Sequence, residues 1–169
     1  MRSRTSGKHS AERSREGLSQ ARENMFGKKR MGSQRGSNRG SSHEYPAMQS
    51  EKQRVYEKIE LKFEKDCFKL IQARDWEKLE VLSVEQLDAC KGKSSKGFFY
   101  LGVALYKMDC CDQAIKAYQK SNDLFPSDPQ LHYNIGLAYF KDEQYTLAVE
   151  HLKLCTQMDP TNVFAYNNL

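Results

Sequence analysis

Apolar residues recur every three or four positions in the part of the chain that follows residue 50. The first such stripe consists of Val55, Ile59, Phe63, Cys67 and the pair Leu70/Ile71. A second stripe consists of Trp76, Leu79, Leu82 and Leu87. This spacing places apolar side chains on one face of a helix, and the polar run KGKSSKG at 91–97 ends the second one. The sequence therefore predicts a helical hairpin over residues 51–94.

The rest of the chain contains an internal repeat with an offset of 34 residues. Segments 95–128 and 129–162 share five identities: Gly102/Gly136, Ala104/Ala138, Lys107/Lys141, Ala114/Ala148 and Pro126/Pro160. Residues 163–169, VFAYNNL, begin a third copy. A fixed period of about 20 to 50 residues is typical of stacked supersecondary units. Each full copy is predicted to form two helices, the second of which ends before the proline.

Gly102 and Gly136 occupy the middle of predicted helices, where glycine costs about 1 kcal/mol relative to alanine. A small residue at this place lets two helices approach closely, and the packing gained offsets that cost. We therefore interpret both glycines as structural and not as part of a nucleotide-binding loop.

The pattern of small and bulky residues resembles that of the tetratricopeptide repeat family, whose motif is 34 residues long. In the first copy the motif positions are Phe98, Leu101, Gly102, Leu105, Ala114, Tyr118, Ser121 and Pro126. In the second they are His132, Ile135, Gly136, Tyr139, Ala148, Leu152, Cys155 and Pro160. The resemblance covers 95–169 and implies an all-α fold, a right-handed superhelical stack of antiparallel helix pairs. Residues 61–94 fit poorly, as a degenerate repeat or a capping hairpin.

The resemblance also implies a concave surface on the first helix of each copy, which in this family binds protein segments. The corresponding residues are Phe99, Tyr100, Val103, Tyr106, Lys107, Gln130, Tyr133, Asn134, Leu137, Phe140, Lys141 and Asn168. Phe99, Tyr106, Tyr133 and Phe140 are the expected apolar anchors. Asn134 and Asn168 share one repeat position, at which the family bonds the backbone of extended peptides. The alternative is that Asn134 only caps or solvates its helix, and the lysine pattern of the chaperone-tail-binding branch is absent.

The N-terminal 50 residues differ from the rest in charge and composition. They hold 11 Lys+Arg and 4 Glu, a net charge of 11 − 4 = +7, whereas residues 51–169 hold 16 Lys+Arg and 18 acidic residues, a net of 16 − 18 = −2. Few of these 50 residues are apolar, so burial cannot offset the entropy of ordering them. The sequence predicts a disordered basic tail. Its segment 27–42, GKKRMGSQRGSNRGSS, attracts phosphate groups through charge and arginine stacking, or is only a solvated arm.

The cysteines do not form a motif that predicts chemistry. Their odd number, five, and their irregular spacing indicate free thiols in a reducing compartment, so we expect a cytoplasmic protein, with a nuclear location as the alternative. Cys110–Cys111 lacks the spacing of a metal or redox site. We expect no cofactor, no metal and no catalytic activity. No stretch approaches the roughly 18 apolar residues of a membrane-spanning helix.

These features together predict a non-catalytic interaction module, a scaffold or adaptor that binds a peptide or helix of a partner within a larger assembly. The alternative is an RNA-associated adaptor whose basic tail binds nucleic acid while the repeats recruit a protein. A catalytic fusion would need a further domain. Because the third copy stops within its first helix, we also expect the native protein to continue, or another subunit to cover this end.

Overall fold

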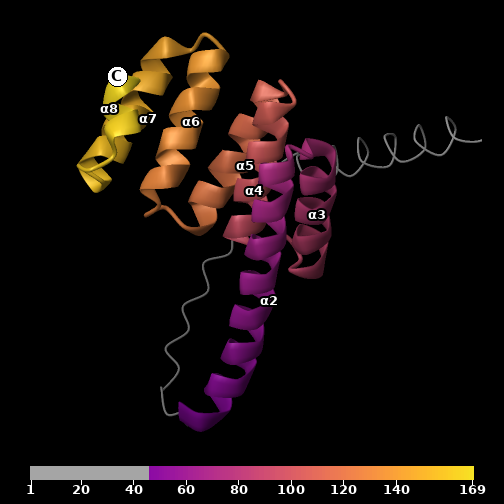
Figure 1. Cartoon of the computed structure of the whole chain (residues 1–169). Helices are drawn as coiled ribbons and strands as arrows, with labels where there is room; N and C mark the ends of the chain where they lie inside the picture. The colour runs from indigo at the N-terminus through magenta and orange to yellow at the C-terminus, as the bar shows by residue number, and fades with distance from the viewer. Residues whose placement is uncertain (1–45) are drawn as a thin grey trace, which may run out of the picture. The chain divides into compact units, whose positions relative to one another are not determined.

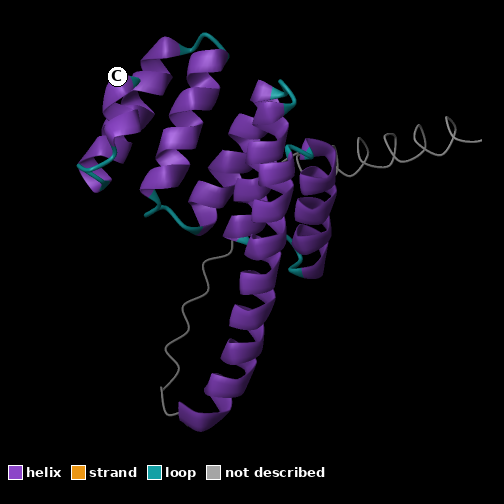
Figure 2. Cartoon of the chain, in the orientation of Figure 1, coloured by secondary structure: helices purple, strands orange, loops and turns teal. Residues whose placement is uncertain are grey.

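The computed structural model describes residues 46–169, so the predicted disordered tail lies outside the described residues up to residue 45. In this described part of the chain seven helices follow one another: α2 (Pro46–Ala73), α3 (Trp76–Ala89), α4 (Ser95–Lys107), α5 (Cys111–Leu124), α6 (Pro129–Lys141), α7 (Tyr145–Met158) and α8 (Val163–Asn167). Within residues 46–169 there is no strand (Figure 2). The predicted all-α fold is confirmed.

Helix α2 begins before residue 51, the predicted start of the hairpin, and its apolar stripe is less buried than the pattern predicts. It starts at Pro46, where a proline fits the first turn because its missing N–H has no helical partner there. The chain divides into two units, and the boundary lies between Lys62 and Phe63. In the first unit the predicted stripe is helical but exposed, since Val55 is 53% and Ile59 49% accessible. In the second unit Phe63 and Cys67 are buried.

Within residues 63–169, each helix from α3 onward packs on the next one (Figure 1). The hairpin turns share one backbone feature: Arg74, Asp109 and Glu143 each adopt a positive φ, of 55°, 63° and 60°. They precede α3, α5 and α7, the second helix of each pair. The first core cluster joins Phe63, Cys67, Leu79 and Ala104. The hairpin before the first copy therefore turns in the same way as the two repeats.

The packing positions of both copies are buried. In the first copy these are Phe98, Leu101, Gly102, Leu105, Ala114, Tyr118 and Ser121, and in the second His132, Ile135, Gly136, Tyr139, Ala148, Leu152 and Cys155. Gly102 lies against the ring of Tyr118, so a Cβ built there would be 2.5 Å from Cε1. A Cβ at Gly136 would lie 2.8 Å from Cγ of Leu152. Both glycines therefore allow close helix contact.

Side-chain caps fix where the first helix of each copy begins. Ser94 Oγ accepts a hydrogen bond from the Gly97 N–H at 3.0 Å. Asp128 Oδ1 accepts from the Gln130 N–H at 2.9 Å, and Pro129 occupies the first turn. Asn162 Oδ1 accepts from the Ala165 N–H at 3.0 Å. These bonds satisfy backbone donors that have no partner within the helix.

Candidate binding surface

The residues predicted to line a groove lie on α4 and α6, which contact each other. We define the helix-A surface as Phe99, Tyr100, Val103, Tyr106 and Lys107 on α4 with Gln130, Tyr133, Asn134, Leu137, Phe140 and Lys141 on α6. Four of them, Lys107, Gln130, Phe140 and Lys141, are exposed, and the others are half-buried. The structure thus brings eleven of the twelve predicted residues onto two neighbouring helices.

Aromatic contacts hold the α4 half of this surface. The rings of Phe99 and Tyr100 meet edge to face at 5.3 Å, and Tyr100 meets Phe63 in the same way at 5.6 Å. Tyr100 and Val103 also pack on the first core cluster. Burial, with Glu64 and Cys67 nearby, raises the pKa of the Tyr100 hydroxyl, so it stays protonated and able to donate. Part of each of these side chains is therefore used in the core.

The α6 half offers one ring to solvent and keeps another in the core. Tyr133 packs on the cluster of Leu152, Cys155 and Ala165. Phe140 is 58% exposed and meets the ring of Tyr145 edge to face at 5.5 Å. Phe140 is therefore the most accessible of the four predicted anchors, since the other three rings are half-buried.

The lysines of this surface are engaged within the molecule. Lys141 Nζ lies 4.9 Å from the ring centre of Tyr106 and forms an ion pair with Asp109. The hydrogen bond to Asp109 raises the pKa of Lys141. Lys107 Nζ lies 5.6 Å from the same ring and 5.9 Å from that of Trp76. Cations and rings thus join successive helix pairs along one edge.

The two asparagines predicted to act together have different settings. Asn134 is half-buried within α6. Asn168 is exposed at the C-terminal cap of α8, and its Nδ2 donates to the Phe164 carbonyl at 2.7 Å. Asn168 therefore lies beyond the last residue of its helix, with one donor already used.

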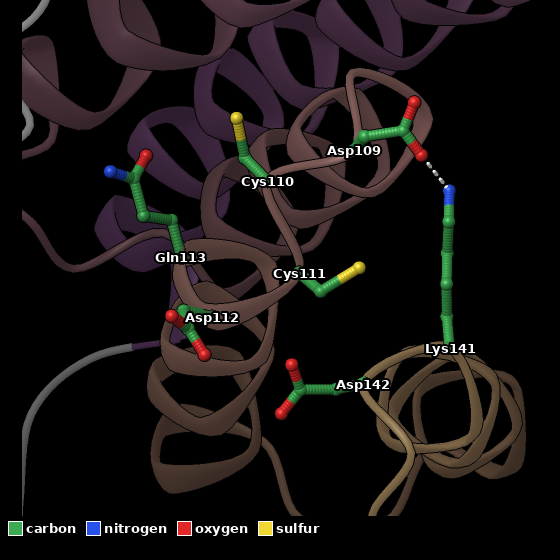
Figure 3. Close-up of a pocket in the computed structure, with 7 residues that line it drawn as sticks. All are labelled: Asp109, Cys110, Cys111, Asp112, Gln113, Lys141 and Asp142. Atoms are coloured by element: carbon green, nitrogen blue, oxygen red, sulfur yellow. Dashed lines mark ion pairs between the residues drawn. The ribbon is translucent and has the colours of Figure 1, made fainter.

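A shallow pocket lies where the α4–α5 turn faces the α6–α7 turn (Figure 3). It is lined by Asp109, Cys110, Cys111, Asp112, Gln113, Lys141 and Asp142. The Cys111 sulfur points toward the gap between Lys141 and Asp142, whereas the Cys110 sulfur points away from it. Burial raises the pKa of the Cys111 thiol, which makes it a poor nucleophile. Sequence reasoning missed this pocket, because its acidic residues come from turns one repeat apart.

Within residues 46–169 there is no group of three or more His, Cys, Asp or Glu side chains that could hold a metal ion. None of the helices there is both long and apolar enough to cross a membrane.

Comparison with known proteins agrees with this geometry. Two family profiles match: "TPR repeat" over residues 111–143 and "Tetratricopeptide repeat" over residues 129–162. A curated relative is the BBSome complex member BBS4 homolog of Drosophila melanogaster, 31% identical over 90 residues. The match covers 53% of this chain but only 18% of that protein.

Solved structures show the same fold at low sequence identity. The TPR domain of Arabidopsis OM64 is 14% identical with a TM-score of 0.60, over 66% of this chain and 91% of that one. The Yersinia enterocolitica type III secretion chaperone SycD, solved with a peptide of the translocator YopD, is 15% identical with a TM-score of 0.55, over 65% and 83%. With the matched profiles and the buried packing positions, these results show tetratricopeptide repeats at residues 111–162 and the helix-pair fold of TPR domains over residues 63–169.

Proposed function

We propose that the helix-A surface binds a segment of a partner protein, and that the chain acts as a non-catalytic scaffold or adaptor in a larger assembly. The observation that carries this proposal is the composition of the surface: aromatic and aliphatic side chains half-exposed on two adjacent helices, with an amide among them. Exposed apolar side chains that gather on one face are typical of protein-binding surfaces.

The mechanism follows from how these side chains are held. Rings fixed by their neighbours lose little conformational entropy on binding, so Tyr106 and Phe140 are suited to fill apolar pockets of a partner. Asn134 has an amide that both donates and accepts, which matches the backbone of an extended segment. Lys107 and Lys141, which already contact rings or Asp109, mainly position Tyr106.

Related proteins support this class of function. SycD was solved with a peptide of YopD, and a further neighbour, 21% identical with a TM-score of 0.52, is a CopN–Scc3 complex. The Drosophila relative is named as a member of a complex. The chain covers less than a fifth of that relative, so membership of a comparable assembly is part of the proposal.

A pull-down from cell extract tests the proposal. The test variant is Asn134→Ala with Phe140→Ala, chosen because Phe140 is exposed and its loss disturbs the core little. The matched control is Lys116→Ala with Lys153→Ala, which changes exposed residues on α5 and α7. We expect the test variant to lose at least some of the proteins that the wild type and the control retain, with all three equally folded by circular dichroism. Equal capture by all three would contradict the proposal.

Nucleic-acid binding by residues 27–42 is the second candidate, supported by two Arg-Gly dipeptides beside Lys28-Lys29-Arg30. Binding of this kind should weaken steeply as salt increases. Nuclease treatment in the same pull-down, and deletion of residues 1–45, separate the two functions. A cytoplasmic or nuclear location stays a prediction.

A further inference from the structure

Two histidines face each other between the helices of the second repeat. Nδ1 of His132, on α6, lies 3.1 Å from Nδ1 of His151, on α7. The ring centres are 5.4 Å apart and the planes are inclined by 25°. The distance between the ring centres exceeds that between the nitrogens by 5.4 − 3.1 = 2.3 Å, which is about twice the distance from a ring centre to its nitrogen. Both nitrogens therefore lie on the line that joins the ring centres, and the rings meet edge to edge. Such a contact is a hydrogen bond only when one nitrogen carries a proton and the other does not.

The surroundings hold this histidine pair in place. His132 is only 5% exposed, and His151 is half-buried. The ring of Tyr139 stacks on His151, with centres 5.6 Å apart. Gln119 on α5 donates from Nε2 to the Tyr139 hydroxyl at 2.9 Å. Residues of three helices therefore hold the pair, and solvent reaches it mainly at the half-buried His151.

The groups that face the pair disfavour a second positive charge. From α6 it meets the uncharged ring of Tyr139, and from α5 the uncharged amide of Gln119 reaches that ring. On α7 itself Glu150 favours a charged His151. Burial, followed by the charge of His132, outweighs Glu150 and lowers the pKa of His151.

The first repeat shows that this architecture does not require histidines here. The residues 34 positions earlier are Phe98 and Ala117, and both are buried. Phe98 and Ala117 have no side-chain proton that titrates, so the first repeat has apolar side chains at both positions. The histidine pair is thus a property of the second repeat.

We propose that the His132–His151 pair makes the packing of α6 on α7 respond to pH, closed while the pair shares a proton and loosened when both rings are charged. Two imidazolium rings would direct two N–H donors and two like charges at each other, so the hydrogen bond would be lost. Because α6 carries Tyr133, Asn134 and Leu137, acidification would also weaken binding at the helix-A surface. Only this last consequence rests on the proposed function.

The first test is histidine side-chain NMR on the full wild-type chain between pH 5 and 8. We expect one of the two rings to be the Nδ1–H tautomer and the other Nε2–H at neutral pH, with coupled titration. Assignment comes from the single variants His132→Phe and His151→Ala. Two Nε2–H rings that titrate independently at the ordinary value would overturn the proposal.

The second test is hydrogen exchange of α6 and α7, with α4 and α5 in the same molecule as the internal reference and intrinsic rates corrected for pH. On lowering the pH from 7.5 to 5, we expect the opening of α6–α7 to increase relative to that of α4–α5. The increase should be at most roughly tenfold for each pH unit by which folding lowers the histidine pKa. The variant His132→Phe/His151→Ala, which copies the first repeat, should lose this dependence. The same pH dependence in both proteins would overturn the proposal. Neither test needs a partner, so failure of partner binding would leave this result standing.

Discussion

A methyl group added at Gly102 tests whether a small residue sets the spacing of the helices in a repeat. In Gly102→Ala the new Cβ would lie 2.5, 2.6 and 2.9 Å from Cε1, Cδ1 and Cζ of Tyr118. Tyr118 is 1% exposed, so its ring has no open space to enter. Overpacking of a core costs about 1–3 kcal/mol, and three overlapping ring atoms favour the upper end. Alanine regains about 1 kcal/mol of helix propensity. The expected net loss of unfolding free energy is about 2 kcal/mol.

Urea denaturation of a double-mutant cycle measures this effect. Tyr118→Ala removes the obstructing ring at a large cost of its own. In that background Gly102→Ala should change sign and stabilise the fold by up to about 1 kcal/mol, because only helix propensity remains. If Gly102→Ala is stabilising in the wild-type background, or equally destabilising in both, the ring contact does not explain the glycine.

Three further predictions concern a cap, an interhelical bond and a thiol. Ser94→Ala removes the oxygen that accepts from the Gly97 N–H and should lower the free energy of unfolding, measured with urea, by about 1 kcal/mol. Ser94→Asp should retain most of the stability, and equal losses in the two variants would contradict the cap. Ser121→Ala removes a donor to the Ser95 carbonyl at 2.9 Å and should cost about 1 kcal/mol by the same assay, and an unchanged value would count against the bond. Burial raises the pKa of Cys67 to about 12, so its thiol should resist alkylation at pH 8 until the protein is unfolded. Mass spectrometry measures the labelling, and rapid labelling of the native protein would refute this prediction.

The repeat packing could be predicted because the chain supplies the same information twice. Phe98 and His132 differ in chemistry, yet both occupy the same position and both are buried. The small residue at the close contact between the two helices is likewise repeated, as Gly102 and Gly136. A position that keeps its size class across two copies reports packing more reliably than periodicity within one helix.

Periodicity alone did not show how much of a helix face is covered. Val55 and Ile59 continue the stripe of Phe63 and Cys67, but they are about half exposed. An amphipathic pattern records that a face is apolar, whereas burial depends on what lies opposite.

Contacts between neighbouring helices were also beyond sequence reasoning. Lys141 was predicted as a lining residue, but it contacts Tyr106 and Asp109 of the preceding copy. His132 was predicted only as a packing position of the second copy, and its contact with Nδ1 of His151 was not foreseen. Such pairs depend on the register of neighbouring helices and on rotamers, which spacing along one helix does not specify.

Site-specific photocrosslinking most directly tests the claim that the helix-A surface receives a protein segment. A photoreactive phenylalanine analogue at Phe140 probes that surface, and the same analogue at Lys153, exposed on α7, is the matched control. In cell extract we predict crosslinks to a partner from position 140 and none to that partner from position 153. Crosslinks to the partner from position 153 alone would place the binding surface elsewhere and contradict the account.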